Sequence, residues 1–245
     1  MQTPTQKDRR KLNADASTII PLTTGIGRLM AIGKHNGATH ERIGSVNNVT
    51  IADGRARLEG PAHSAVVDLA QVNSITADFS AAMGEKAMPR LDFLNSSGEP
   101  VFSIVALDGR DGFDRAFSAV PAEPLTDGVE PARPERRELA KDDPGFLVLD
   151  TIRQSGEPVE LRLERPGFTQ TWEGIVERVS DGMGFANVMT ESFHLHLRGG
   201  SVARWNWDND ASRLVALNAE GEPIGLSIRG SASALSALGA DGTTL

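Results

Sequence analysis

The residues of this sequence best suited to chemistry are its five histidines, two of which form a closely spaced pair. His194 and His196 alternate with apolar residues over 193–197, and this period of two is typical of a β-strand. Both imidazoles would then lie on one face of the strand, where they can hold a divalent metal if a third ligand joins them. Glu191 or a carboxylate distant in the sequence could supply that ligand. The alternative is that both histidines line a solvated or cleft-facing sheet surface.

The composition excludes several kinds of site. The chain has no cysteine and no tyrosine. This rules out disulfides, thiolate zinc sites, iron–sulfur clusters, a cysteine nucleophile, covalent c-type heme attachment and phenolate chemistry. The formal net charge is −8, and the 25 lysines and arginines are scattered along the chain. Because binding to phosphates needs clustered positive charge, we expect no nucleic-acid partner.

The hydrophobic pattern is typical of a soluble globular protein. The chain has 245 residues, 39% of them hydrophobic, which is enough for two modest cores or one large core. No stretch approaches the roughly 18 uncharged apolar residues of a membrane-spanning helix. The charged N-terminal residues are not followed by the apolar run of a signal peptide. We therefore expect no membrane span and a cytoplasmic location.

Two parts of the sequence repeat each other. Residues 90–101 (RLDFLNSSGEPV) and 213–224 (RLVALNAEGEPI) are identical at seven of twelve positions, with an offset of 123 residues. Two shorter matches lie upstream in the same order: Asn48-Val49 with Asn187-Val188, and Thr39-His40-Glu41 with Thr171-Trp172-Glu173. Because so long a period does not suit a solenoid, the pattern predicts two equivalent domains.

The local pattern within each repeat is mostly strand, and the turns lie close together, which favours antiparallel pairing. The expected strands are 46–58, 65–69, 90–94, 101–107, 159–163, 172–179, 193–197, 202–207, 214–217 and 224–228. Helical patterns occur around 26–32, 113–120, 134–141 and 231–238. We therefore predict an α+β fold of two tandem pseudo-repeats, each a mainly antiparallel β-sheet with a few flanking helices.

The domain boundaries follow from composition. Residues 121–145 contain five prolines among many charged side chains, with little apolar surface to bury, which predicts a linker. On this basis the chain divides into five parts: a flexible N-terminus at 1–24, a first repeat at 25–120, the linker at 121–145, a second repeat at 146–230 and a C-terminal tail at 231–245.

Three segments resemble the bacterial hemin-transport and hemin-degrading factors, the HemS/ChuX-like family built from two tandem pseudo-repeats. Residues 33–44 (GKHNGATHERIG) are similar to the family's Arg-Asn tract followed by Val-His-Glu and a glycine. Residues 167–174 (GFTQTWEG) and 186–198 (ANVMTESFHLHLR) resemble two segments of the second repeat, and the last is the most specific. With both Gly-Glu-Pro hairpins, the resemblance touches most of 26–108 and 158–230.

The resemblance implies heme as the cofactor. The histidine of the first segment is an iron ligand in members of the family, and here that position is His40. A neutral imidazole is a good ligand for heme iron, and the stretch around His40 is rich in turn-forming residues. Glu41 would orient the imidazole and Arg42 would pair with a heme propionate. His35 is either a second axial or distal group or a solvated loop histidine.

The sequence also departs from the family pattern. Members commonly carry Asp-Leu-Arg after the first segment, with the arginine facing the heme, whereas Asp68-Leu69 is followed here by Ala70. Full-length members have a helix between the repeats that supplies a histidine for a second site, and this chain has the charged linker instead. Sequence matching places Trp172 at the equivalent of His40, and an indole cannot bind iron. A heme site is therefore expected only in the first repeat.

Three functions follow as hypotheses. The first is a cytoplasmic heme-binding protein for heme trafficking and utilisation, with one heme held by His40 and exchanged with a heme-import component or a heme acceptor, as a monomer or a homodimer. The second is an enzyme that degrades heme with oxygen and an external reductant, because the sequence has no flavin or nicotinamide motif; no residue is assigned as catalytic. The third is a degenerate duplicate that has lost heme and acts as an interaction or regulatory protein.

Overall fold

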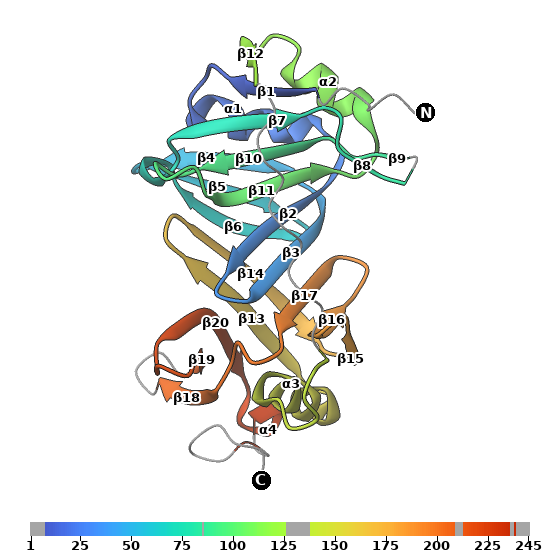
Figure 1. Ribbon diagram of the computed structural model, residues 1–245, viewed down its shortest axis with the longest axis vertical. Coiled ribbons are helices and arrows are strands. Elements are labelled where there is room, and N and C mark those ends of the chain that lie inside the picture. The colour runs from blue at the N-terminus through green and yellow to red at the C-terminus, as the bar shows by residue number, and fades with distance from the viewer. Residues whose placement is uncertain (1–7, 85, 126–137, 209–212, 236–237, 239–245) are drawn as a thin grey trace. The chain divides into compact units, whose positions relative to one another are not determined.

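A computed structural model describes residues 8–84, 86–125, 138–208, 213–235 and 238. Antiparallel strands dominate, with a few short helices, which confirms the predicted fold class (Figure 1). The chain divides into two compact units. Unit 1 comprises Met1–Ile32, Arg42–Arg133 and Pro166–Phe168, and unit 2 comprises Gly33–Glu41, Pro134–Arg165 and Thr169–Leu245. Among the described residues, no helix is long and apolar enough to cross a membrane.

Unit 1 has strands in two sheets, with short helices. One set has the order β12 (Ala122–Pro124), β1 (Arg9–Leu12), β7 (Ser74–Asp78), β10 (Arg90–Leu94), β11 (Pro100–Ala106), β2 (Arg28–His35). The other has the order β6 (His63–Asp68), β5 (Arg55–Gly60), β4 (Asn48–Ala52). The remaining elements are α1 (Ala16–Leu22), α2 (Arg110–Phe117), the 3-10 turns η1 (Thr23–Gly25) and η2 (Leu69–Gln71), and the short pair β8 (Ala82–Met83) and β9 (Lys86–Ala87).

Unit 2 is built in a similar way. One set of strands has the order β18 (Arg204–Asp208), β19 (Arg213–Leu217), β20 (Pro223–Gly230), β13 (Pro158–Arg165), β14 (Phe168–Ile175). The other has the order β3 (Ala38–Ser45, of which Ala38–Glu41 belong to this unit), β17 (Phe193–Arg198), β16 (Phe185–Met189), β15 (Val179–Gly182). Its helices are α3 (Pro144–Ser155) and α4 (Ala232–Leu235).

Each unit has its own hydrophobic core, because alternate residues of its strands point inward. In unit 1 the rings of Phe93 and Phe102 stack at 4.2 Å, and Phe168 stacks on Phe102 at 5.0 Å. In unit 2 the ring of Trp172 stacks on that of Phe193 at 4.5 Å. Aromatic stacking adds to the stabilisation that comes from burying these side chains.

The repeats make the same turn where their sequences match. The Asn95 side-chain oxygen accepts from the Glu99 backbone N–H at 2.9 Å, and that of Asn218 accepts from the Glu222 N–H at 2.8 Å. Gly98 and Gly221 both have positive φ angles, 78° and 82°. Asparagine bonds readily to its own turn backbone and glycine tolerates positive φ, so this shared motif is explained by turn geometry.

The structure corrects the alignment of the repeats. The hairpins β2–β3 and β13–β14 each join two eight-residue strands through a two-residue turn. His40 is therefore the third residue of β3 as Gln170 is of β14, and both are fully buried. Sequence matching chose Trp172 because the Thr-x-Glu identity outweighed two shifted positions. In chain order β16 likewise corresponds to β5, so the match of Asn48-Val49 with Asn187-Val188 is wrong.

The predicted flexible N-terminus is wrong from residue 8 onward. Leu12 of β1 and Ile19 and Ile20 of α1 are buried in the core of unit 1. The predicted helix at 26–32 is also wrong, since these residues lead into β2, where Leu29 and Ala31 point into the same core. Alternate burial of apolar residues favours a strand over a helix at this position.

The structure agrees in part with two other predicted helices, and it has secondary structure at both ends of the predicted linker. Helix α2 (Arg110–Phe117) confirms 113–117 of the helix expected at 113–120, and α4 confirms part of 231–238. At one end of the predicted linker lies β12, and at the other α3 begins at Pro144. Residues 126–137 of the linker, including part of the helical pattern at 134–141, and 236–237 and 239–245 of the tail lie outside the described residues.

Candidate functional site

His40 lies in the middle of β3 and not in a turn, and its side chain has no exposed surface. Its Nε2 is 3.2 Å from the Leu161 carbonyl oxygen, and its Nδ1 is 2.9 Å from the Gln170 amide nitrogen. A carbonyl oxygen only accepts, so Nε2 must carry the proton and Nδ1 must accept from the amide. The ring also packs against Phe193, at 4.8 Å between ring centres. These partners all belong to unit 2.

This environment is that of a buried structural histidine. Both ring nitrogens have hydrogen-bond partners and the side chain is fully buried, so neither nitrogen is open to a metal in this arrangement. The role of His40 as an iron ligand stays a prediction, and it requires the ring to leave both partners. Although His40 belongs to the first repeat in sequence, its side chain packs within unit 2.

Glu41, His194 and His196 form a cluster on the opposite face of the same strands. The Glu41 Oε2 is 3.3 Å from Nδ1 of His194 and 3.7 Å from Nε2 of His196. One candidate ligand atom from each residue lies within 4.8 Å of the others. The strand prediction for the two histidines is confirmed. The carboxylate beside them is Glu41, which the family resemblance assigns to orienting His40, whereas Glu191 is not part of the cluster.

Asn187 on β16 forms a hydrogen bond with Nδ1 of His196, the ring nitrogen that is not directed at Glu41. The Asn187 side-chain oxygen is 2.6 Å from Nδ1 of His196. Its side-chain NH₂ lies within hydrogen-bond distance of the carbonyls of Ser180, Gly182 and Phe185. Because the NH₂ end points to carbonyls, the oxygen end must face the histidine. Nδ1 of His196 therefore carries the proton, and Nε2 has a free lone pair when the ring is neutral.

Glu41 is the most strongly perturbed acid of the described residues. Burial alone would raise the pKa of its carboxyl, but hydrogen bonds from His194 and His196, together with their charge, outweigh burial and lower that pKa to about 2. Glu41 is therefore a carboxylate across the whole physiological pH range. A carboxylate that faces two imidazoles can hold a proton or a metal between them.

Arg42 points to the face of β3 opposite to Glu41, and it belongs to unit 1. Its guanidinium is buried, and its Nε donates to the Ala62 carbonyl. Burial lowers the pKa of Arg42 to about 10. Close by, Nε2 of His63 donates to the Gly44 carbonyl at 3.0 Å, and burial lowers the pKa of that imidazole, assisted by the Arg42 charge. The predicted pairing of Arg42 with a propionate stays a prediction.

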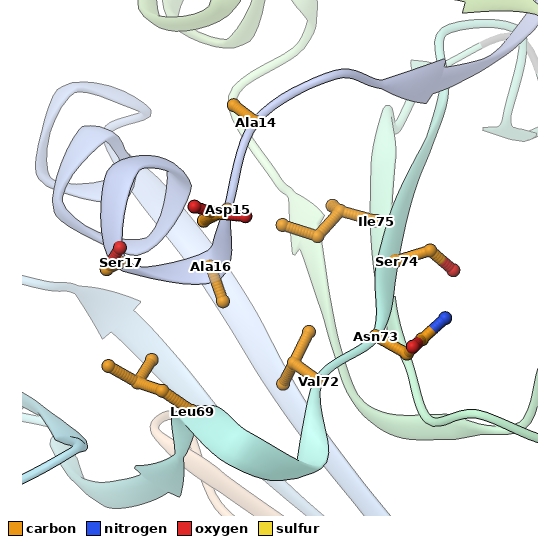
Figure 2. Close-up of a pocket in the computed structure, with 9 residues that line it drawn as sticks. All are labelled: Ala14, Asp15, Ala16, Ser17, Leu69, Val72, Asn73, Ser74 and Ile75. Atoms are coloured by element: carbon orange, nitrogen blue, oxygen red, sulfur yellow. The ribbon is translucent and has the colours of Figure 1, made fainter.

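His35 and a surface pocket complete the candidate sites. His35 is half-buried at the end of β2, and its Nε2 is 3.3 Å from the side-chain nitrogen of Asn36. Burial lowers the pKa of His35, as does the charge of Arg165. A pocket of about 260 Å³ lies between the start of α1 and the η2–β7 segment, and none of its lining residues is a histidine. Figure 2 shows these residues. That volume is below the range of most small-molecule sites.

Comparison with known proteins identifies solved structures that have a similar fold. No protein-family model and no curated protein sequence matches the chain. Among solved structures it is similar to ChuS, a heme oxygenase of Escherichia coli, with 17% identity, a TM-score of 0.73 and coverage of 91% of this chain and 83% of ChuS. It is also similar to the heme-bound form of PhuS, a heme-binding protein of Pseudomonas aeruginosa, with 15% identity, a TM-score of 0.72 and coverage of 91% and 82%.

The chain therefore has the fold of ChuS and PhuS over nearly its whole length. The resemblance predicted from the sequence motifs is confirmed at the level of the fold.

Proposed function

We propose that this protein binds heme and serves in heme trafficking or utilisation. The observation that carries the proposal is the fold, which the chain shares over 91% of its length with a heme oxygenase and a heme-binding protein. The three motif segments support the same assignment from the sequence. The proposal places this activity in the cytoplasm, with a heme-import component or a heme acceptor as the exchange partner and a homodimer as one form of the protein.

The described arrangement does not fit a heme on His40. Its ring donates to the Leu161 carbonyl and accepts from Gln170, and the side chain is fully buried. Glu41 faces His194 and His196 and does not orient the ring of His40. We therefore propose heme binding as the function, and keep His40 as the ligand that the family resemblance implies and that experiment must test.

Titration with ferric heme tests the proposal. We expect a shifted Soret band that saturates near one equivalent per chain. Absence of a saturable change contradicts heme binding and leaves the third hypothesis, a duplicate that has lost heme.

The variant H40Q tests the ligand separately. Glutamine can still donate to Leu161 and accept from Gln170, so this variant should keep the fold while losing the imidazole. A lost or displaced Soret band in H40Q supports His40 as the ligand. An unchanged band overturns that role while heme binding itself stands.

Heme degradation is the second candidate function, because ChuS, with the same fold, is described as a heme oxygenase. The loaded protein can be given ascorbate in air, with a ferrous-iron chelator present to report release. We expect the Soret band to persist, as for a carrier. Loss of the band with release of iron would favour the enzyme.

A further inference from the structure

We propose that Glu41, His194 and His196 form a binding site for a divalent transition-metal ion. The site does not depend on heme and uses none of the contacts of His40. It lies entirely within unit 2.

The sheet places the three side chains together. β3 and β17 are neighbours in the sheet, and their residues alternate between a buried face and a more open face. His40 and Phe193 point to the buried face, so Glu41, His194 and His196 must point to the other. Adjacent strands lie about 4.8 Å apart, which brings such side chains within reach of one ion.

The distances suit a metal after small side-chain movements. The carboxylate oxygen is 3.3 Å from one histidine nitrogen and 3.7 Å from the other, and the candidate ligand atoms all lie within 4.8 Å. Ligand atoms that lie about 2.1 Å from a tetrahedral metal are roughly 3.4 Å apart. Rotations of these three partly exposed side chains are enough to reach that geometry.

The contact with Asn187 prepares His196 for a metal. Its oxygen accepts from Nδ1 at 2.6 Å, which leaves the lone pair of Nε2 directed at the Glu41 carboxylate. This contact is favourable when a cation lies between the two atoms, and that cation can be a proton on Nε2 or a metal ion that displaces the proton. Metal-binding histidines characteristically donate their second N–H to such an oxygen, which fixes the ring and raises its basicity.

The donor set indicates the class of ion. Two imidazole nitrogens and one carboxylate oxygen favour first-row divalent ions such as Zn²⁺ or Fe²⁺, whereas Mg²⁺ and Ca²⁺ prefer oxygen ligands. The side chains of His194 and His196 are 22% and 28% exposed. Solvent can therefore supply the remaining ligands, as in metal sites with three protein ligands and an open position.

The experiment uses the full chain after treatment with a chelator. Zn²⁺ binding is measured by calorimetry, and Co²⁺ is added as a spectroscopic probe whose visible bands report nitrogen ligation. We expect one equivalent of either ion to bind. In E41Q and in H196A the affinity should fall by roughly tenfold or more, and in N187A, which keeps all three ligands, by about 10–100-fold.

Two matched controls separate the site from general effects. E191Q removes the nearest carboxylate that the sequence suggested, and H35A removes an imidazole of unit 2 outside the cluster. Both should bind Zn²⁺ as the wild type does. Absence of stoichiometric binding by the wild type overturns the proposal, as does equal loss in E191Q and E41Q. Circular dichroism of each variant shows whether it is folded.

Discussion

At the scale of single residues, His40 and Glu41 show how neighbours in sequence acquire different roles. His40 is buried between Gln170 and Leu161, and Glu41 faces two partly exposed histidines. The alternation of a strand accounts for the difference, because consecutive residues point to opposite faces. A single sequence motif therefore contains one structural histidine and one ligand-like carboxylate.

Replacing His40 by alanine should destabilise the protein by about 2–4 kcal/mol. The change opens a cavity and leaves the Leu161 carbonyl without this buried donor. Urea unfolding gives the free-energy difference. T39A, a change at the half-buried neighbouring position, should cost less than about 1 kcal/mol. If both variants are destabilised equally, the buried hydrogen bonds of His40 make no particular contribution to the free energy of unfolding.

His63 should make stability depend on pH. Burial lowers the pKa of its imidazole in the folded state, so on acidification the unfolded chain takes up the proton first. The stabilisation is complete above the unfolded pKa of about 6.5 and is lost as pH falls below it, by up to about 1.4 kcal/mol per pH unit.

The test compares the free energy of unfolding of wild type and H63Q at pH 7.5 and 5.5. The variant should lose less stability than the wild type over this interval. His35 contributes with the same sign and remains in both proteins, so a reduced dependence, not its disappearance, is expected. An equal loss in both proteins would show that the His63 proton is not involved.

At the scale of elements, the paired turns at 95–99 and 218–222 are the best-preserved trace of the duplication. Both use the asparagine side chain and a glycine with positive φ. G98A and G221A should each cost about 1–2 kcal/mol, because alanine is strained in that conformation. The control S97A, in the exposed part of the same turn, should stay within about 0.5 kcal/mol.

Thermal or urea unfolding of the three variants provides the measurement. The two glycine variants should be destabilised by similar amounts, since both glycines have positive φ and both turns have the hydrogen bond from the glutamate N–H to the asparagine side chain. A large effect at one turn and none at the other would contradict their equivalence.

Local pattern was sufficient to predict strands such as β10, β11, β17 and β20, but not the hairpin β2–β3 or the start of α3. That helix begins with the Asp143 side chain accepting from the Phe146 N–H at 2.9 Å and from the Gly200 N–H at 2.8 Å. The first contact is an ordinary helix cap, which the proline-rich surroundings obscured in the sequence. The second comes from a residue 57 positions away and has no local signal.

The cluster of Glu41, His194 and His196 was predictable only for its two histidines, for the same reason. The period of two put His194 and His196 on one face of a strand, and the structure agrees. Glu41 lies 153 positions from His194 in the sequence, and only the pairing of β3 with β17 brings them together. Pairing between strands so far apart is set by the whole fold and not by local propensity.

At the scale of the whole molecule, the shared fold with ChuS and PhuS is the basis for proposing heme binding. The duplication also accounts for the contact between His40 and Gln170, which occupy equivalent positions of their repeats and meet in one core. In this chain His40 forms a buried hydrogen bond with Gln170. Heme binding and the role of His40 as iron ligand must therefore be tested separately.

The most direct test of heme binding is a Soret titration of the wild type beside E41Q, with ferric heme as the only ligand. We expect both proteins to saturate near one equivalent with the same shifted band, because the proposed metal cluster does not take part. A wild-type protein that shows no saturable Soret change would contradict the central claim.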